Sequence, residues 1–109
     1  MVPFLHNTYI AANGLNKMSV DTVIYAITRQ RIRFTNSPES FGPEGQRKVL
    51  TMLEVMRTQL MSEDIVGFDD YIDMKLAKEP DLADFVLEEL FEQLNITDRD
   101  ELTAKLLEA

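Results

Sequence analysis

Three arginines in the stretch YAITRQRIRFTN, residues 25–36, are the first candidates for binding chemistry in this chain. Arg29, Arg31 and Arg33 stand at alternate positions. The planar guanidinium group of arginine forms paired hydrogen bonds with phosphates and carboxylates, and the ring of Tyr25 can stack on a base. On a helix, Tyr25, Arg29 and Arg33 share one face because they are four residues apart. Together, the tyrosine and the three arginines form a candidate contact for a nucleic acid or an acidic partner: Tyr25, Arg29, Arg31 and Arg33.

Nucleic-acid binding and internal ion pairing are both open interpretations of these arginines. Residues 9–34 fit the outline of a helix-turn-helix, with a first helix over 9–13, Gly14 in the turn and a recognition helix from Ser19. The formal net charge of −8 argues against this hypothesis, because phosphate contacts dominate nucleic-acid affinity and an acidic protein repels DNA. Alternatively, the arginines pair with carboxylates of the same chain or of a second copy in a homodimer. Each such exposed pair adds about 0–1 kcal/mol.

The acidic residues are concentrated in the second half of the chain. Residues 1–50 carry six Lys and Arg against three Asp and Glu, whereas residues 51–109 carry five against sixteen. Such an asymmetry indicates a charged partner, or two halves that face each other within the fold or across a homo-oligomer.

The segment DLADFVLEELFEQL, residues 81–94, collects this negative charge on one side of a predicted helix. The core-facing stripe of that helix comprises Ala83, Val86, Leu87, Leu90 and Leu94. Phe85 falls nearly opposite the stripe, and its neighbours on the polar face are Asp81, Glu88, Glu89 and Glu92. A large apolar residue among acids indicates a surface for a basic protein partner, unless a neighbouring segment with Phe4 and Leu5 covers it.

The types and spacing of the remaining polar residues do not indicate a metal site or a catalytic centre. One carboxylate cluster comprises Glu63, Asp64, Asp69, Asp70 and Asp73. Calcium and magnesium take oxygen ligands, but the EF-hand order is absent. The last three acids fall in or near the first turn of a helix predicted over 68–79, where they suit the helix dipole. His6 is the single histidine, and no nucleophile–histidine–carboxylate motif or glycine-rich phosphate loop is visible. We predict no metal, no cofactor and no enzymatic activity.

Length and composition predict one globular domain. The chain has 109 residues, of which 45% are hydrophobic and 28% charged. It lacks cysteine, which excludes disulfides and thiolate zinc sites. The first residues, MVPFLHNTYI, do not resemble a signal peptide, and no run approaches the roughly 18 apolar residues of a membrane span. We expect a cytoplasmic protein without membrane contact.

Helical periodicity predicts an all-α fold, a compact bundle of four to five short helices in a single domain. We expect a loosely packed N-terminal segment over 1–18, a helix over 19–31 and a loop over 35–46. Residues 28–34 are open to two interpretations, helix or extended chain, because the alternating arginines also fit a strand. The other helices are expected over 44–61, 68–79, 81–94 and 98–109. The helix over 44–61 is predicted to bury one apolar stripe, which comprises Val49, Met52, Leu53, Met56 and Leu60. Gly67 is expected to break the chain, Pro80 to start a helix, and Thr97 with Asp100 to form a capping box.

The predicted function follows from charge and helical content together. Small acidic helical proteins are common among inhibitors, adaptors, assembly chaperones and phage-encoded regulators. We therefore predict a protein-interaction module that binds a basic protein surface through its acidic C-terminal half. The alternative is a nucleic-acid-binding regulator that uses residues 9–34.

Overall fold

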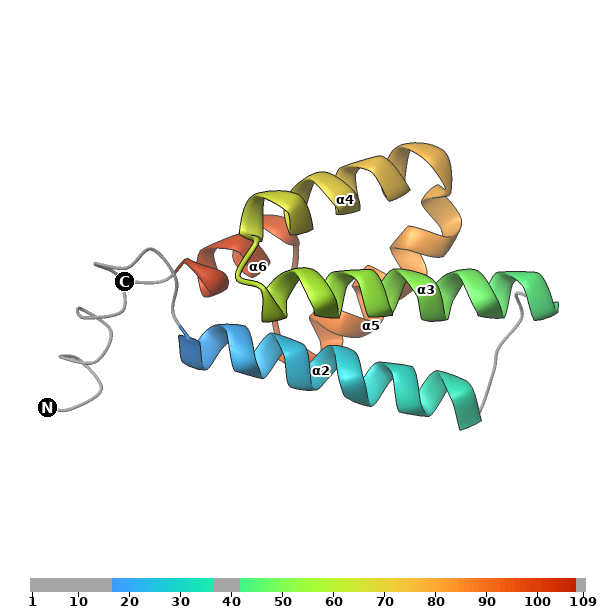
Figure 1. Ribbon diagram of the computed structural model, residues 1–109, viewed down its shortest axis with the longest axis horizontal. Helices are drawn as coiled ribbons and strands as arrows, with labels where there is room; N and C mark the ends of the chain where they lie inside the picture. The colour runs from blue at the N-terminus through green and yellow to red at the C-terminus, as the bar shows by residue number, and fades with distance from the viewer. Residues whose placement is uncertain (1–16, 37–41, 108–109) are drawn as a thin grey trace, which may run out of the picture.

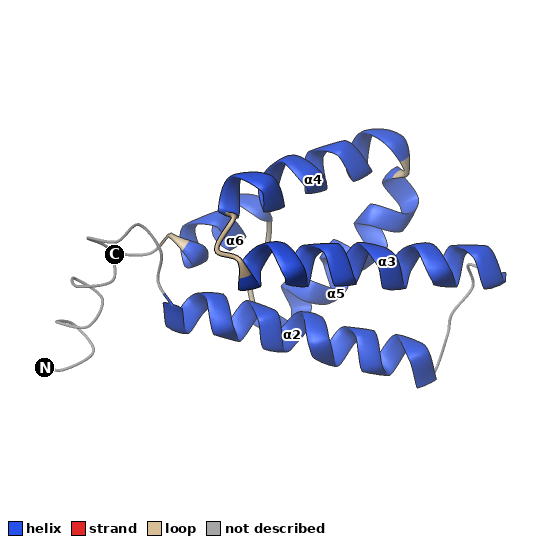
Figure 2. Cartoon of the chain, viewed as in Figure 1, coloured by secondary structure: helices blue, strands red, loops and turns tan. Residues whose placement is uncertain are grey.

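A computed structural model describes residues 17–36 and 42–107 of the chain, and five α-helices make up most of this part (Figures 1 and 2). No strand occurs among the described residues, which confirms the all-α prediction. The helices are α2 (Lys17–Asn36), α3 (Gly42–Met61), α4 (Ile65–Lys78), α5 (Pro80–Leu94) and α6 (Arg99–Leu106).

The helices are arranged around α3. In Figure 1, α2 and α3 lie side by side and run in opposite directions, and α4 returns along the other side of α3. Helix α5 crosses behind α3 from the end of α4 to α2, so that it contacts all three of these helices. Helix α6 packs near the start of α2, at the end of the molecule opposite the α4–α5 connection.

The central position of α3 explains its continuous apolar stripe. The stripe predicted from the sequence is buried throughout, with exposed fractions of 2% or less, and comprises Val49, Met52, Leu53, Met56 and Leu60. These residues recur every three or four positions, so they line one face of the helix. Because α3 meets α2, α4 and α5, that face forms the middle of the core.

Helix α2 is longer than predicted, and its last turns are helical. The sequence left residues 28–34 open between helix and extended chain, and they are helical, because α2 continues to Asn36. The buried residues Ile27, Gln30 and Phe34 follow helical spacing and hold these turns against the core. The loop predicted over 35–46 was also too long, since residues 35–36 belong to α2 and residues 42–46 to α3.

The predicted break at Gly67 was wrong, because Gly67 lies inside the first turn of α4. The chain turns instead at residues 62–64, where Glu63 adopts a left-handed conformation with φ of 59°. The carboxylate of Asp64 caps α4 by accepting a hydrogen bond from the Gly67 N–H at 2.9 Å. A Cβ on Gly67 would lie within 2.3 Å of that carboxylate. The glycine therefore makes room for the cap.

This earlier start of α4 corrects the expected role of three acids. Asp69, Asp70 and Asp73 lie beyond the first turn of α4, which contains no acidic residue, so they do not complement the N-terminal dipole as predicted.

The caps of α5 and α6 are partly as predicted. Pro80 starts α5, as expected. The Thr97/Asp100 capping box was misplaced by one residue, because Asp98 is the N-cap of α6 and accepts from the Glu101 N–H at 3.0 Å. The Glu101 carboxylate in turn accepts hydrogen bonds from the Thr97 hydroxyl and from the Thr97 N–H, the latter at 2.7 Å. These two bonds from Thr97, that of the hydroxyl first, lower the pKa of Glu101.

None of the helices within the described ranges combines the length and the apolar character that crossing a bilayer requires.

Candidate functional site

Helix α5 is fixed by its two ends and by one apolar face. Pro80 begins it, and Asn95 ends it in the left-handed conformation, with its N–H bonded to the carbonyls of Phe91 and Glu92. The buried residues are Leu82, Ala83, Val86, Leu87 and Leu90. This confirms most of the predicted stripe, adds Leu82 and leaves Leu94 half-buried.

The outward side of α5 carries a line of four exposed carboxylates, which we call the acidic row: Asp81, Asp84, Glu88 and Glu92. Spacings of three and four residues place them on one face of the helix. Their side chains form no ion pair or hydrogen bond with any residue in the described ranges. Asp84 was missed in the sequence, although its position three residues after Asp81 was a signal for it.

Phe85 and Glu89 border the acidic row on the side of α5 that faces α2. The ring of Phe85 is half-buried and meets the ring of Phe34 edge to face, with centroids 5.6 Å apart. Glu89 pairs with Arg33 at 3.9 Å. Phe34 thus covers the ring of Phe85, which was expected to lie among exposed acids. The segment that was expected to cover it, with Phe4 and Leu5, lies outside the described residues. Both Phe85 and Glu89 help to attach α5 to α2.

The three arginines of α2 have different surroundings. Arg31 pairs with Glu54 of α3 at 3.5 Å, and Arg33 pairs with Glu89 of α5, both through half-exposed side chains. Internal pairing is therefore confirmed for these two. Arg29 forms no ion pair within the described part of the chain, and its guanidinium lies over the ring of Tyr25, 5.8 Å from the centroid. The first helix of the proposed helix-turn-helix lies outside the described residues.

The predicted carboxylate cluster is divided among structural contacts. Asp69 and Asp73 of α4 each accept a hydrogen bond from the Arg99 guanidinium of α6, and we call these three residues the Arg99 clamp. Asp64 caps α4. Among the described residues, no three His, Asp or Glu side chains are grouped so as to hold a metal ion.

A second ion-pair network joins α3, α4 and the start of α5. The Glu79 carboxylate accepts from Lys48 at 2.8 Å and from Lys75 at 2.5 Å. The hydrogen bonds from Lys48 and Lys75 lower the pKa of Glu79 to about 2. The same contact with Glu79 raises the pKa of Lys48. Glu79 therefore remains charged at neutral pH, which suits a residue that holds helices together.

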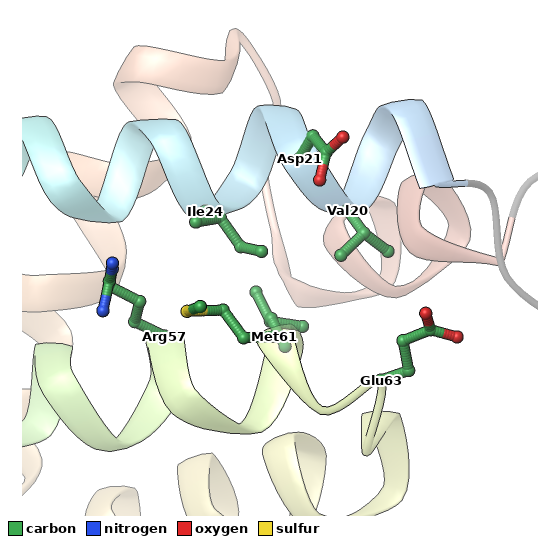
Figure 3. A pocket seen from close by; sticks show the side chains of 7 residues that line it. Val20, Asp21, Ile24, Arg57, Met61 and Glu63 are labelled. Atoms are coloured by element: carbon green, nitrogen blue, oxygen red, sulfur yellow. The ribbon is translucent and has the colours of Figure 1, made fainter.

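A pocket of about 320 Å³ opens between the start of α2 and the end of α3 (Figure 3). Val20 and Ile24 point into it from α2, and Met61 points toward them from α3. Arg57 and Glu63 stand at its sides. Its lining is mixed, because Asp21, Arg57 and Glu63 stand beside the apolar side chains.

Comparison with known proteins adds no functional information: no protein-family model, curated protein or solved structure matches the chain.

Proposed function

We propose that this protein is a non-enzymatic interaction module of the cytoplasm, such as an inhibitor, adaptor or assembly factor, that binds a basic protein surface. The acidic row of α5 is the contact. The observation that supports this proposal is a continuous line of unpaired charge: the four carboxylates of the row share one face of α5 and have no ion pair or hydrogen bond in the described ranges. In contrast, Asp69, Asp73 and Glu79 of the same half bind cations, and Asp64 and Asp98 cap helices.

The geometry of the row suits a binding surface with a matching line of cations. Residues 81 and 92 are separated by about 16 Å along a helix, at 1.5 Å per residue. The helix beneath them is fixed by its buried face, so the carboxylates start from defined positions. Contacts between such rows of opposite charge accelerate association and weaken with salt.

The proposal is tested by reversing charge within the row. Full-length protein captures partners from cells of its native host, and the affinity for each captured protein is then measured with the double variant Glu88→Lys/Glu92→Lys. We expect a loss of about tenfold or more, mostly through a slower on-rate whose salt dependence becomes weaker.

A matched control distinguishes the effect of the row's position on affinity from the effect of net charge. Glu44→Lys/Asp70→Lys makes the same change in net charge at two exposed acids on α3 and α4. It is expected to retain most of the affinity. Equal affinity of the wild type and the Glu88/Glu92 variant for every captured partner would refute the proposal.

A further inference from the structure

We draw no further inference here: the strongest candidate, the pocket between the start of α2 and the end of α3, carries nothing, because its lining mixes apolar and charged side chains and nothing in the structure shows what covers it.

Discussion

In the Arg99 clamp, two carboxylates of α4 hold a guanidinium that reaches over from α6, whereas in the acidic row four carboxylates of α5 face outward. The residue types are the same, and both groups lie in the acidic half of the chain. The difference is the position of a cation: Arg99 is 30 residues from Asp69 in the sequence and adjacent to it in the fold. Negative charge in this protein therefore serves either the fold or a surface, according to its neighbours.

The largest expected difference between the two groups is in stability. Arg99→Met leaves Asp69 and Asp73 next to each other without their cation, and it loosens α6. We expect the free energy of unfolding to fall by about 1–2 kcal/mol, because charged hydrogen bonds are lost and two like charges remain. Glu88→Gln/Glu92→Gln should change it by no more than about 0.5 kcal/mol. Urea denaturation measures both.

Lys105→Met provides the control for this comparison, since Lys105 belongs to the same helix and forms no ion pair within the described residues. The Lys105→Met substitution is expected to lower the free energy of unfolding by less than about 0.5 kcal/mol. If Arg99→Met proved as mild as Lys105→Met, the clamp would contribute nothing to stability, and the distinction between the two groups would be lost.

A buried amide extends the comparison from surface charges to the core. Gln30 is 1% exposed and lies between α2 and α5. Its amide nitrogen donates to the Val86 carbonyl at 3.3 Å, and its amide oxygen has no hydrogen-bond partner among the described residues. Gln30→Leu removes the unsatisfied oxygen and fills the space with an apolar side chain. We expect the free energy of unfolding to rise by up to about 1 kcal/mol, because an unpaired buried polar atom is costly.

Thermal and urea unfolding check this prediction, with Gln46→Leu on α3 as a partly exposed comparison whose amide is not among the buried, unpaired groups. A loss of stability in Gln30→Leu would show that the amide contributes more through its hydrogen bond than its oxygen costs. The packing of α2 against α5 would then depend on a polar contact.

The sequence alone predicted those parts of the structure that depend on local periodicity. The stripe of α3, the start of α5 at Pro80 and most of the buried face of α5 were predicted, because each is determined by residues within a few turns. The acidic face of α5 was also predicted, and Asp84 extends it.

The sequence alone did not predict the conformation or the contacts of residues that depend on a distant neighbour or on side-chain geometry. The sequence left residues 28–34 open between helix and extended chain, because Phe34 is held in the last turns of α2 by its contact with Phe85, 51 positions away. Gly67 was interpreted as a helix break. Its role in making room for the Asp64 cap depends on the position of the Asp64 carboxylate, which the sequence does not show. The separate environments of Arg29, Arg31 and Arg33 likewise required the positions of α3 and α5.

The smallest expected effect is a pH dependence of stability. It distinguishes Glu79, a paired carboxylate, from the unpaired carboxylates of the acidic row. Two lysines lower the pKa of Glu79 from 4.5 to about 2, so folding favours its charged form. The stabilisation is complete above the ordinary pKa of 4.5 and disappears as the pH falls toward 2. We expect Glu79→Gln to unfold at a lower temperature than the wild type at pH 7, and the two melting temperatures to converge near pH 2.

Glu88→Gln is the control for this measurement, because it removes a carboxylate that has no ion pair in the described part of the chain. Its melting temperature should stay close to that of the wild type between neutral and acid pH. A constant difference between Glu79→Gln and the wild type over the same range would mean that Glu79 acts through packing and not through its charge. The Lys48 and Lys75 contacts would then not account for its position between α3, α4 and α5.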